Sequence, residues 1–139
     1  MTTITACLCF YDERPEMLAR CVRSLAGVCE QLVVLDGAFA RYPYDGDGIY
    51  SPNEQAGTIA KCAREAELEL TYEGGLFDDQ PAKRTALMQL GVASGAEWLL
   101  VIDGDEAVRS YNARLRERLA ATVTDVSAFG GPRVPGVRW

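Results

Sequence analysis

Apolar and polar positions follow two different periods along this chain. Short apolar runs at 3–10, 31–35 and 98–102 are typical of strands buried on both faces of a parallel sheet. We expect the run at 98–102 to be a central strand. Residues 67–72 alternate strictly between polar and apolar, which predicts an edge strand with one solvated face.

Between these runs, apolar residues recur at the spacing of one helix face. Helices are expected from Pro15 to Gly27, from Ser51 onward, from Pro81 to Gly95, and over 110–122. Ser51 is predicted to cap its helix, because proline follows it at the first helical position. The last helix carries arginines that we expect to be solvated: Arg109, Arg114, Arg116 and Arg118.

The alternation of strands and helices predicts the fold class. A further strand is expected at 124–129, and residues 130–139 are expected to form a tail. Such an order favours an α/β domain spanning 1–139, with a mostly parallel sheet and helices on both faces. In sheets of this kind, ligands bind beyond the carboxyl ends of the strands.

Composition excludes several classes of function. The net charge of −6 disfavours a nucleic-acid binder, which needs a basic face. The chain has no histidine, so histidine-dependent hydrolysis and histidine-ligated zinc are excluded. Five cysteines without metal-site spacing are typical of free thiols in a reducing compartment. No signal peptide and no apolar run of about 18 residues is present, so we expect a cytoplasmic protein with no membrane span.

The most informative polar segment follows the apolar run at 98–102. It reads Asp103-Gly104-Asp105-Glu106, and its three carboxylates repel one another unless a positive charge lies among them. Mg²⁺ and Mn²⁺ prefer such oxygen ligands and often share them with a substrate phosphate. The alternative is a polar turn. Neither a Walker-type phosphate loop nor a Gly-x-Gly-x-x-Gly motif is present.

Three segments together resemble one known family. The first segment is the first strand with its Tyr-Asp-Glu-Arg-Pro loop and the following helix (3–24), and the second is the strand ending in Asp-Gly (32–37). The third is the Asp-x-Asp-Glu segment with the helix before it (83–106). They are similar to segments of family 2 glycosyltransferases. These enzymes have the Rossmann-like GT-A fold. The resemblance covers about 3–37 and 80–108.

The resemblance implies transfer of a sugar from a nucleotide-diphosphate donor, usually a UDP-sugar, with Mn²⁺ or Mg²⁺ as cofactor. It implies a role in donor binding for Phe10, Tyr11, Glu13, Asp36, Lys83 and Asp103, and metal ligation by Asp105. Phe10, Tyr11 and Glu13 would line the base and ribose pocket, and Asp36 would accept a hydrogen bond from the base. Lys83 would lie near the nucleotide, and Asp103 would contact the ribose or a metal-bound water.

Each of these residues also has a structural interpretation. Phe10 and Tyr11 can close the core, and Asp36 can cap a turn. Lys83 can be a solvated helix residue, and Glu106 can cap the next helix.

The sequence departs from the family after Glu106. The family's acceptor site and its catalytic base lie in the half that follows, whereas about 30 residues remain here, so we expect a truncated form with an unknown acceptor and an unknown base. Three hypotheses stay open: a transferase whose acceptor half is absent or supplied by another chain, a binding module without activity, and a metal-dependent sugar nucleotidyltransferase. The edge strand also leaves a homodimer open.

Overall fold

The computed structural model describes residues 2–40, 48–109 and 114–121. The elements follow one another as β1 (Ile4–Phe10), α1 (Pro15–Arg23), β2 (Gln31–Asp36), α2 (Asn53–Glu65), β3 (Glu69–Gly74), α3 (Gln80–Ala93), β4 (Trp98–Asp103) and α4 (Leu115–Ala121). The predicted strand at 124–129, the tail at 130–139 and the start of the helix predicted over 110–122 lie outside the described residues.

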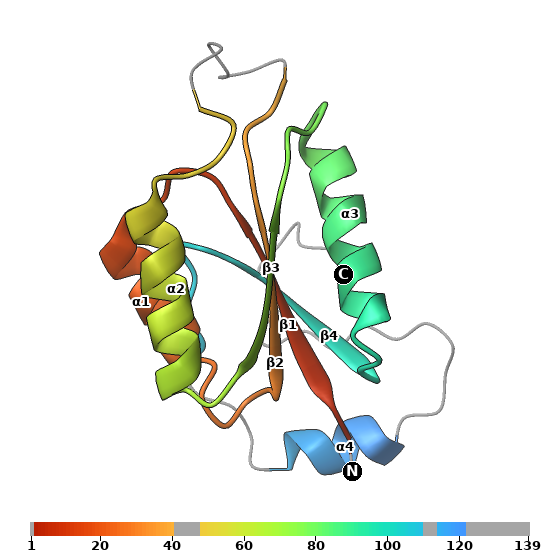
Figure 1. Cartoon of the computed structure of the whole chain (residues 1–139). Coiled ribbons are helices and arrows are strands. Elements are labelled where there is room, and N and C mark those ends of the chain that lie inside the picture. The colour runs from red at the N-terminus through yellow and green to blue at the C-terminus, as the bar shows by residue number, and fades with distance from the viewer. Residues whose placement is uncertain (1, 41–47, 110–113, 122–139) are drawn as a thin grey trace.

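The four described strands form an all-parallel sheet in the order β3-β2-β1-β4. Helices α1 and α2 cover one face of the sheet and α3 covers the other (Figure 1). The predicted α/β fold with a parallel sheet and helices on both faces is therefore confirmed, and the architecture is consistent with a Rossmann-like fold. In the part of the chain that the structure describes, no helix is both long and apolar enough to cross a membrane.

Strand β1 is the centre of the hydrophobic core, since its neighbours on both sides are strands and helices cover both of its faces. Leu8 lies opposite Val34 on one side and Ile102 on the other, and these side chains join the cluster beneath α1 and α2. Cys7 faces the other way, with Leu87 of α3. Burial raises the pKa of the Cys7 thiol to about 11, so this thiol stays protonated at neutral pH.

The two outer strands of the described sheet are β3 and β4. Strand β3 lies at an edge, as its alternation predicted, and its exposed and half-buried residues alternate. That the run at 98–102 is a central strand stays a prediction, because the strand expected at 124–129 lies outside the described residues. Among the described strands β4 is the last in the sheet, and Ile102 is its one buried residue. Side chains of β4 contact both layers, which explains the apolar run, but only β1 pairs with it among the described strands.

Helix α3 approaches the sheet closely at a glycine. Its buried residues are Lys83, Leu87 and Gly91, spaced four apart. A Cβ atom at Gly91 would lie 2.7 Å from Sγ of Cys7 and 3.0 Å from a methyl carbon of Leu99. The absence of a side chain at Gly91 thus sets the distance between α3 and the sheet.

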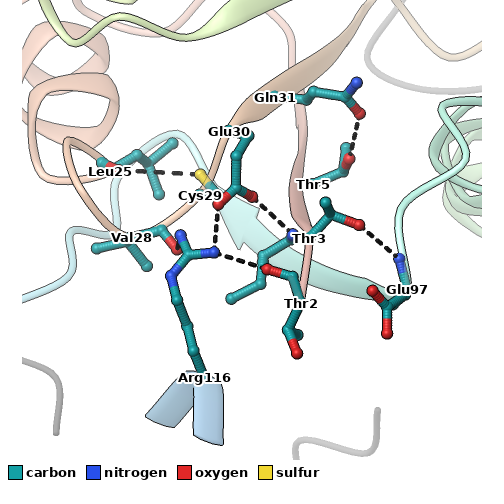
Figure 2. Close-up of polar contacts among 11 residues, drawn as sticks. Thr2, Thr3, Thr5, Leu25, Val28, Cys29, Glu30, Gln31, Glu97 and Arg116 are labelled. Carbon is teal, nitrogen blue, oxygen red and sulfur yellow. Dashed lines mark hydrogen bonds and ion pairs between the residues drawn. The ribbon is translucent and has the colours of Figure 1, made fainter. Parts of the chain in front are cut away.

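Helix α4 is attached to the end of the sheet where the strands begin (Figure 1). Arg116 forms an ion pair with Glu30 and donates to the carbonyl oxygens of Thr2 (2.8 Å) and Val28 (2.9 Å), as Figure 2 shows. The other oxygen of Glu30 accepts from the backbone N–H of Ile4 at 2.8 Å. The prediction that Arg116 is merely solvated was therefore wrong, because the guanidinium satisfies backbone carbonyls that the sheet leaves unpaired.

Candidate functional site

Three predicted site residues lie at the carboxyl edge of the sheet, where parallel strands end together. In the strand register Phe10 lies opposite Asp36, and Cys9 lies opposite Asp103. The edge divides into two parts that differ in burial. We call them the closed half (Phe10, Asp36, Ser51, Tyr72 and Lys83) and the open half (Arg84, Asp103, Asp105 and Glu106).

Asp36 is the centre of the closed half and is 2% exposed. One carboxylate oxygen accepts from the Ser51 hydroxyl at 2.5 Å, and the other accepts from the Ser51 N–H at 2.9 Å and the Tyr72 hydroxyl at 3.2 Å. Burial, and then the negative charge of Asp36, raise the pKa of the Tyr72 hydroxyl well above its usual range. Both oxygens of Asp36 are thus engaged inside the protein. Their partners are 15 and 36 residues away in sequence, so Asp36 has a structural role other than the turn cap that was its alternative interpretation.

Ser51 therefore has a different role from the predicted helix cap. The N-cap of α2 is Pro52, and no side chain caps the helix. The Ser51 hydroxyl instead accepts from the backbone N–H of Asp12 at 2.8 Å while donating to Asp36. The cap prediction was wrong because the hydroxyl accepts from the N–H of Asp12, and its bond to the buried Asp36 carboxylate directs it away from the helix end.

Lys83 is also buried in the closed half, with 2% exposure. Its ammonium group donates to the carbonyl oxygens of Phe10 (2.6 Å) and Gly37 (2.7 Å), so it joins the ends of β1 and β2. The rings of Phe39 and Phe77 lie 5.3 and 5.8 Å from Nζ, within the range of cation–π attraction. Burial lowers the pKa of Lys83. Lys83 therefore lies at the end of the sheet, but its ammonium group points into the protein.

The aromatic and acidic residues after β1 differ in exposure. Phe10 is buried and packs edge-to-face on Tyr72, with ring centroids 6.3 Å apart. Tyr11 is half-buried and its hydroxyl donates to the carbonyl oxygen of Gly48 at 2.8 Å. Glu13 is half-buried and accepts from the N–H of Arg14 at 2.9 Å. Tyr11 and Glu13 thus retain partial access to solvent, whereas Phe10 closes the core.

Asp12 lies in this loop with a strained backbone. Its φ of 48° falls in the left-handed region, which residues other than glycine seldom adopt. Its carboxylate accepts from Nε2 of Gln55 at 2.9 Å, and Oε1 of Gln55 is buried with no hydrogen-bond partner among the described residues. Strained backbone and buried polar atoms without partners are found more often at functional sites than elsewhere.

The open half carries the exposed charges of this edge. Asp103 has a side chain 44% exposed, and its Oδ1 lies 2.9 Å from a guanidinium nitrogen of Arg84. Glu106 is exposed and its carboxylate accepts from the backbone N–H of Asp103 at 2.9 Å. Glu106 therefore closes the turn after β4. This differs from the predicted capping of the next helix, since α4 begins at Leu115 and the bond of Glu106 is to the end of β4.

Asp105 is exposed, and its backbone carbonyl accepts from Arg20 at 3.2 Å. No three acidic or thiol side chains among the described residues are placed together as a ready-made metal site. The donors present are those of a cation that takes one or two carboxylates and completes its coordination with phosphate oxygens and water, as Mg²⁺ does. In this sense Asp103 and Asp105 fit a metal shared with a diphosphate.

Gly104 brings this turn against the start of α1. A Cβ atom there would lie 3.1 Å from Cδ2 of Leu18 and 3.5 Å from Cγ of Glu13. The close packing joins the carboxylate turn to the loop after β1.

Sequence reasoning missed Arg84, Ser51 and Tyr72 as members of this edge. Arg84 follows Lys83 directly, and a signal existed, because two adjacent cations on a helix cannot both point inward. Tyr72 lies at the last apolar position of the alternating strand, where a polar tip reaches the sheet end.

No protein-family model matches the chain, and a comparison with curated proteins gives no match either.

Proposed function

We propose that this protein binds a nucleotide-diphosphate sugar, in the manner of a GT-A glycosyltransferase, at the open half of the carboxyl edge. The observation that carries the proposal is the presence of two carboxylates, the half-exposed Asp103 and the exposed Asp105, at the end of a parallel strand that lies beside β1. Carboxyl ends of such strands are where α/β proteins bind ligands. The three sequence segments that resemble family 2 glycosyltransferases meet at this edge.

Asp105 and Asp103 would hold the divalent cation, with Asp103 acting through a water molecule. The cation would neutralise charge on a departing nucleoside diphosphate, which is electrostatic stabilisation of the leaving group. Tyr11 and Glu13, half-buried on the neighbouring loop, would contact the nucleoside. Asp36 and Lys83 would act indirectly, by holding the ends of β1 and β2 in place.

Binding is tested by calorimetric titration of UDP and UDP-sugars, first with Mn²⁺ and then with EDTA. We expect binding with Mn²⁺ that EDTA abolishes, and we expect Asp105→Ala to weaken it about 10-fold or more. Glu97→Ala is the matched control, because Glu97 is an exposed carboxylate beside the other end of the same strand. A folded wild-type protein that binds no nucleotide would refute the proposal.

Transfer is tested separately from binding. Release of free sugar or its transfer to added acceptors would support a transferase, whereas binding without turnover would support a binding module. Incorporation of a nucleoside triphosphate would instead indicate a nucleotidyltransferase.

A further inference from the structure

Two adjacent cations of α3 differ in exposure and in partners. Lys83 is 2% exposed and is held by the carbonyl oxygens of Phe10 and Gly37. The side chain of Arg84 is 37% exposed and lies 2.9 Å from Asp103. Of this pair, Arg84 is therefore the cation that can reach a ligand at the open half.

Arg84 offsets negative charge in the open half. Asp103, Asp105 and Glu106 place three negative charges within four residues, and such charges raise one another's energy. Glu106 turns back onto a backbone N–H, and Arg20 contacts only the carbonyl oxygen of Asp105. The Arg84 guanidinium is the partner that the structure gives to the Asp103 carboxylate.

We propose that Arg84 exchanges partners when the site is loaded: it holds Asp103 in the metal-free protein and contacts the diphosphate when a divalent cation takes over Asp103. The inference rests on the proposed function. The planar guanidinium presents paired N–H donors that match two phosphate oxygens as well as they match a carboxylate. The negative charge of Asp103 is neutralised in both states, by Arg84 in the metal-free protein and by the cation in the loaded one.

The surroundings of Arg84 permit this movement. A half-exposed ion pair is weak, because water screens it. Arg84 also lies at one end of a shallow open hollow along α3, which is lined by Arg84, Thr85, Met88, Gln89 and Val92. The side chain therefore has open space beside it, whereas Lys83 has none.

The exchange predicts effects of opposite sign in Arg84→Gln. Mn²⁺ alone, followed by the electron paramagnetic resonance signal of the free ion, should bind about 3-fold tighter, because Asp103 has lost its competitor. UDP titrated at saturating Mn²⁺ should bind about 10-fold weaker, because a charged contact to the diphosphate is gone. Arg84→Lys should weaken UDP binding less than Arg84→Gln does, since lysine keeps the positive charge although it lacks the paired N–H donors of the guanidinium.

Arg23→Gln is the matched control, since Arg23 forms an exposed pair with Glu65 on α1 and α2. Arg23→Gln should change neither the affinity for Mn²⁺ nor the affinity for UDP. Thermal melting should show that all variants are folded. Weaker binding of both Mn²⁺ and UDP in Arg84→Gln, or no change in either, would overturn the exchange while leaving the proposed function intact. A wild-type protein that binds neither Mn²⁺ nor UDP would overturn both.

Discussion

The two halves of the carboxyl edge use similar residues for different purposes. In the closed half, Asp36 and Lys83 are each 2% exposed and each makes at least two hydrogen bonds inside the protein. In the open half, Arg84 and Asp103 pair with each other at the surface. A charge that is buried and fully bonded stabilises the fold, whereas an exposed charge can leave its partner for a ligand.

The difference shows that position at a strand end does not by itself identify a binding residue. Asp36 and Asp103 both end a strand that pairs with β1. Only Asp103 presents its carboxylate to solvent. The predictions below test this division by measuring stability in the closed half and binding in the open half.

The largest effect is expected for Gly37→Ala, next to Asp36 of the closed half. Gly37 has a φ of 148°, and a Cβ atom there would lie 1.7 Å from the carbonyl oxygen of Gly75. Because backbone must move, we expect a loss of about 4 kcal/mol in the free energy of unfolding, measured with urea. Gly57→Ala is the control, since nothing lies within 4 Å of its Cβ position, and it should stabilise α2 by about 0.5–1 kcal/mol. Equal stability of the two variants would contradict the closed packing.

Lys83→Met should cost about 2–4 kcal/mol, because it leaves the carbonyl oxygens of Phe10 and Gly37 without their donor. Urea unfolding of Lys61→Met, an exposed lysine on α2, provides the comparison and should differ little from the wild type. If Lys83→Met kept full stability but lost nucleotide binding, Lys83 would belong to the ligand site instead.

Asp36→Asn should cost about 1–3 kcal/mol, since charge-assisted bonds to Ser51 and Tyr72 are weakened. The pKa of Tyr72 should fall but stay above its ordinary value of 10.0, because burial, the larger cause, remains. A raised pKa in the folded state means that stability is lost as pH rises above 10, so this loss should be less steep in the variant. Absorbance of tyrosinate in alkaline titration measures the shift, with Asp78→Asn as an exposed control.

The smallest effect on stability is expected for Asp103→Asn in the open half. Its ion pair with Arg84 is partly exposed, so the loss should be about 0.5 kcal/mol or less and should vanish at about 1 M salt. Metal-dependent UDP binding should fall clearly in the same variant. A loss of stability as large as that of Asp36→Asn would erase the distinction between the halves.

The local pattern predicted which segments form strands and helices, because alternation and helical spacing depend only on neighbouring residues. It placed β3 at an edge correctly. It could not fix the place of β4 in the sheet, because an apolar run reports that both faces of a strand are covered, not how many strands lie beside it. Strand order is a property of the whole chain.

Side-chain direction at the site was harder to predict for the same reason. Lys83 and Arg84 are adjacent on α3, about 100° apart around the helix axis, so only the docking of the helix decides which of them is buried. Similarly, the partner of Ser51 is Asp36, 15 residues away in sequence, and no helix-capping rule includes such a residue.

Gly91 controls how closely α3 packs on the sheet. It is a point of close approach between α3 and the sheet, about two turns along the helix from Lys83 and Arg84. A methyl group inserted there would press against Cys7 and Leu99 and tilt the helix away from the sheet. Both cations would then move together, Lys83 away from the carbonyl oxygens of Phe10 and Gly37 and Arg84 away from the carboxylate of Asp103, so one buried methyl group would disturb both halves at once.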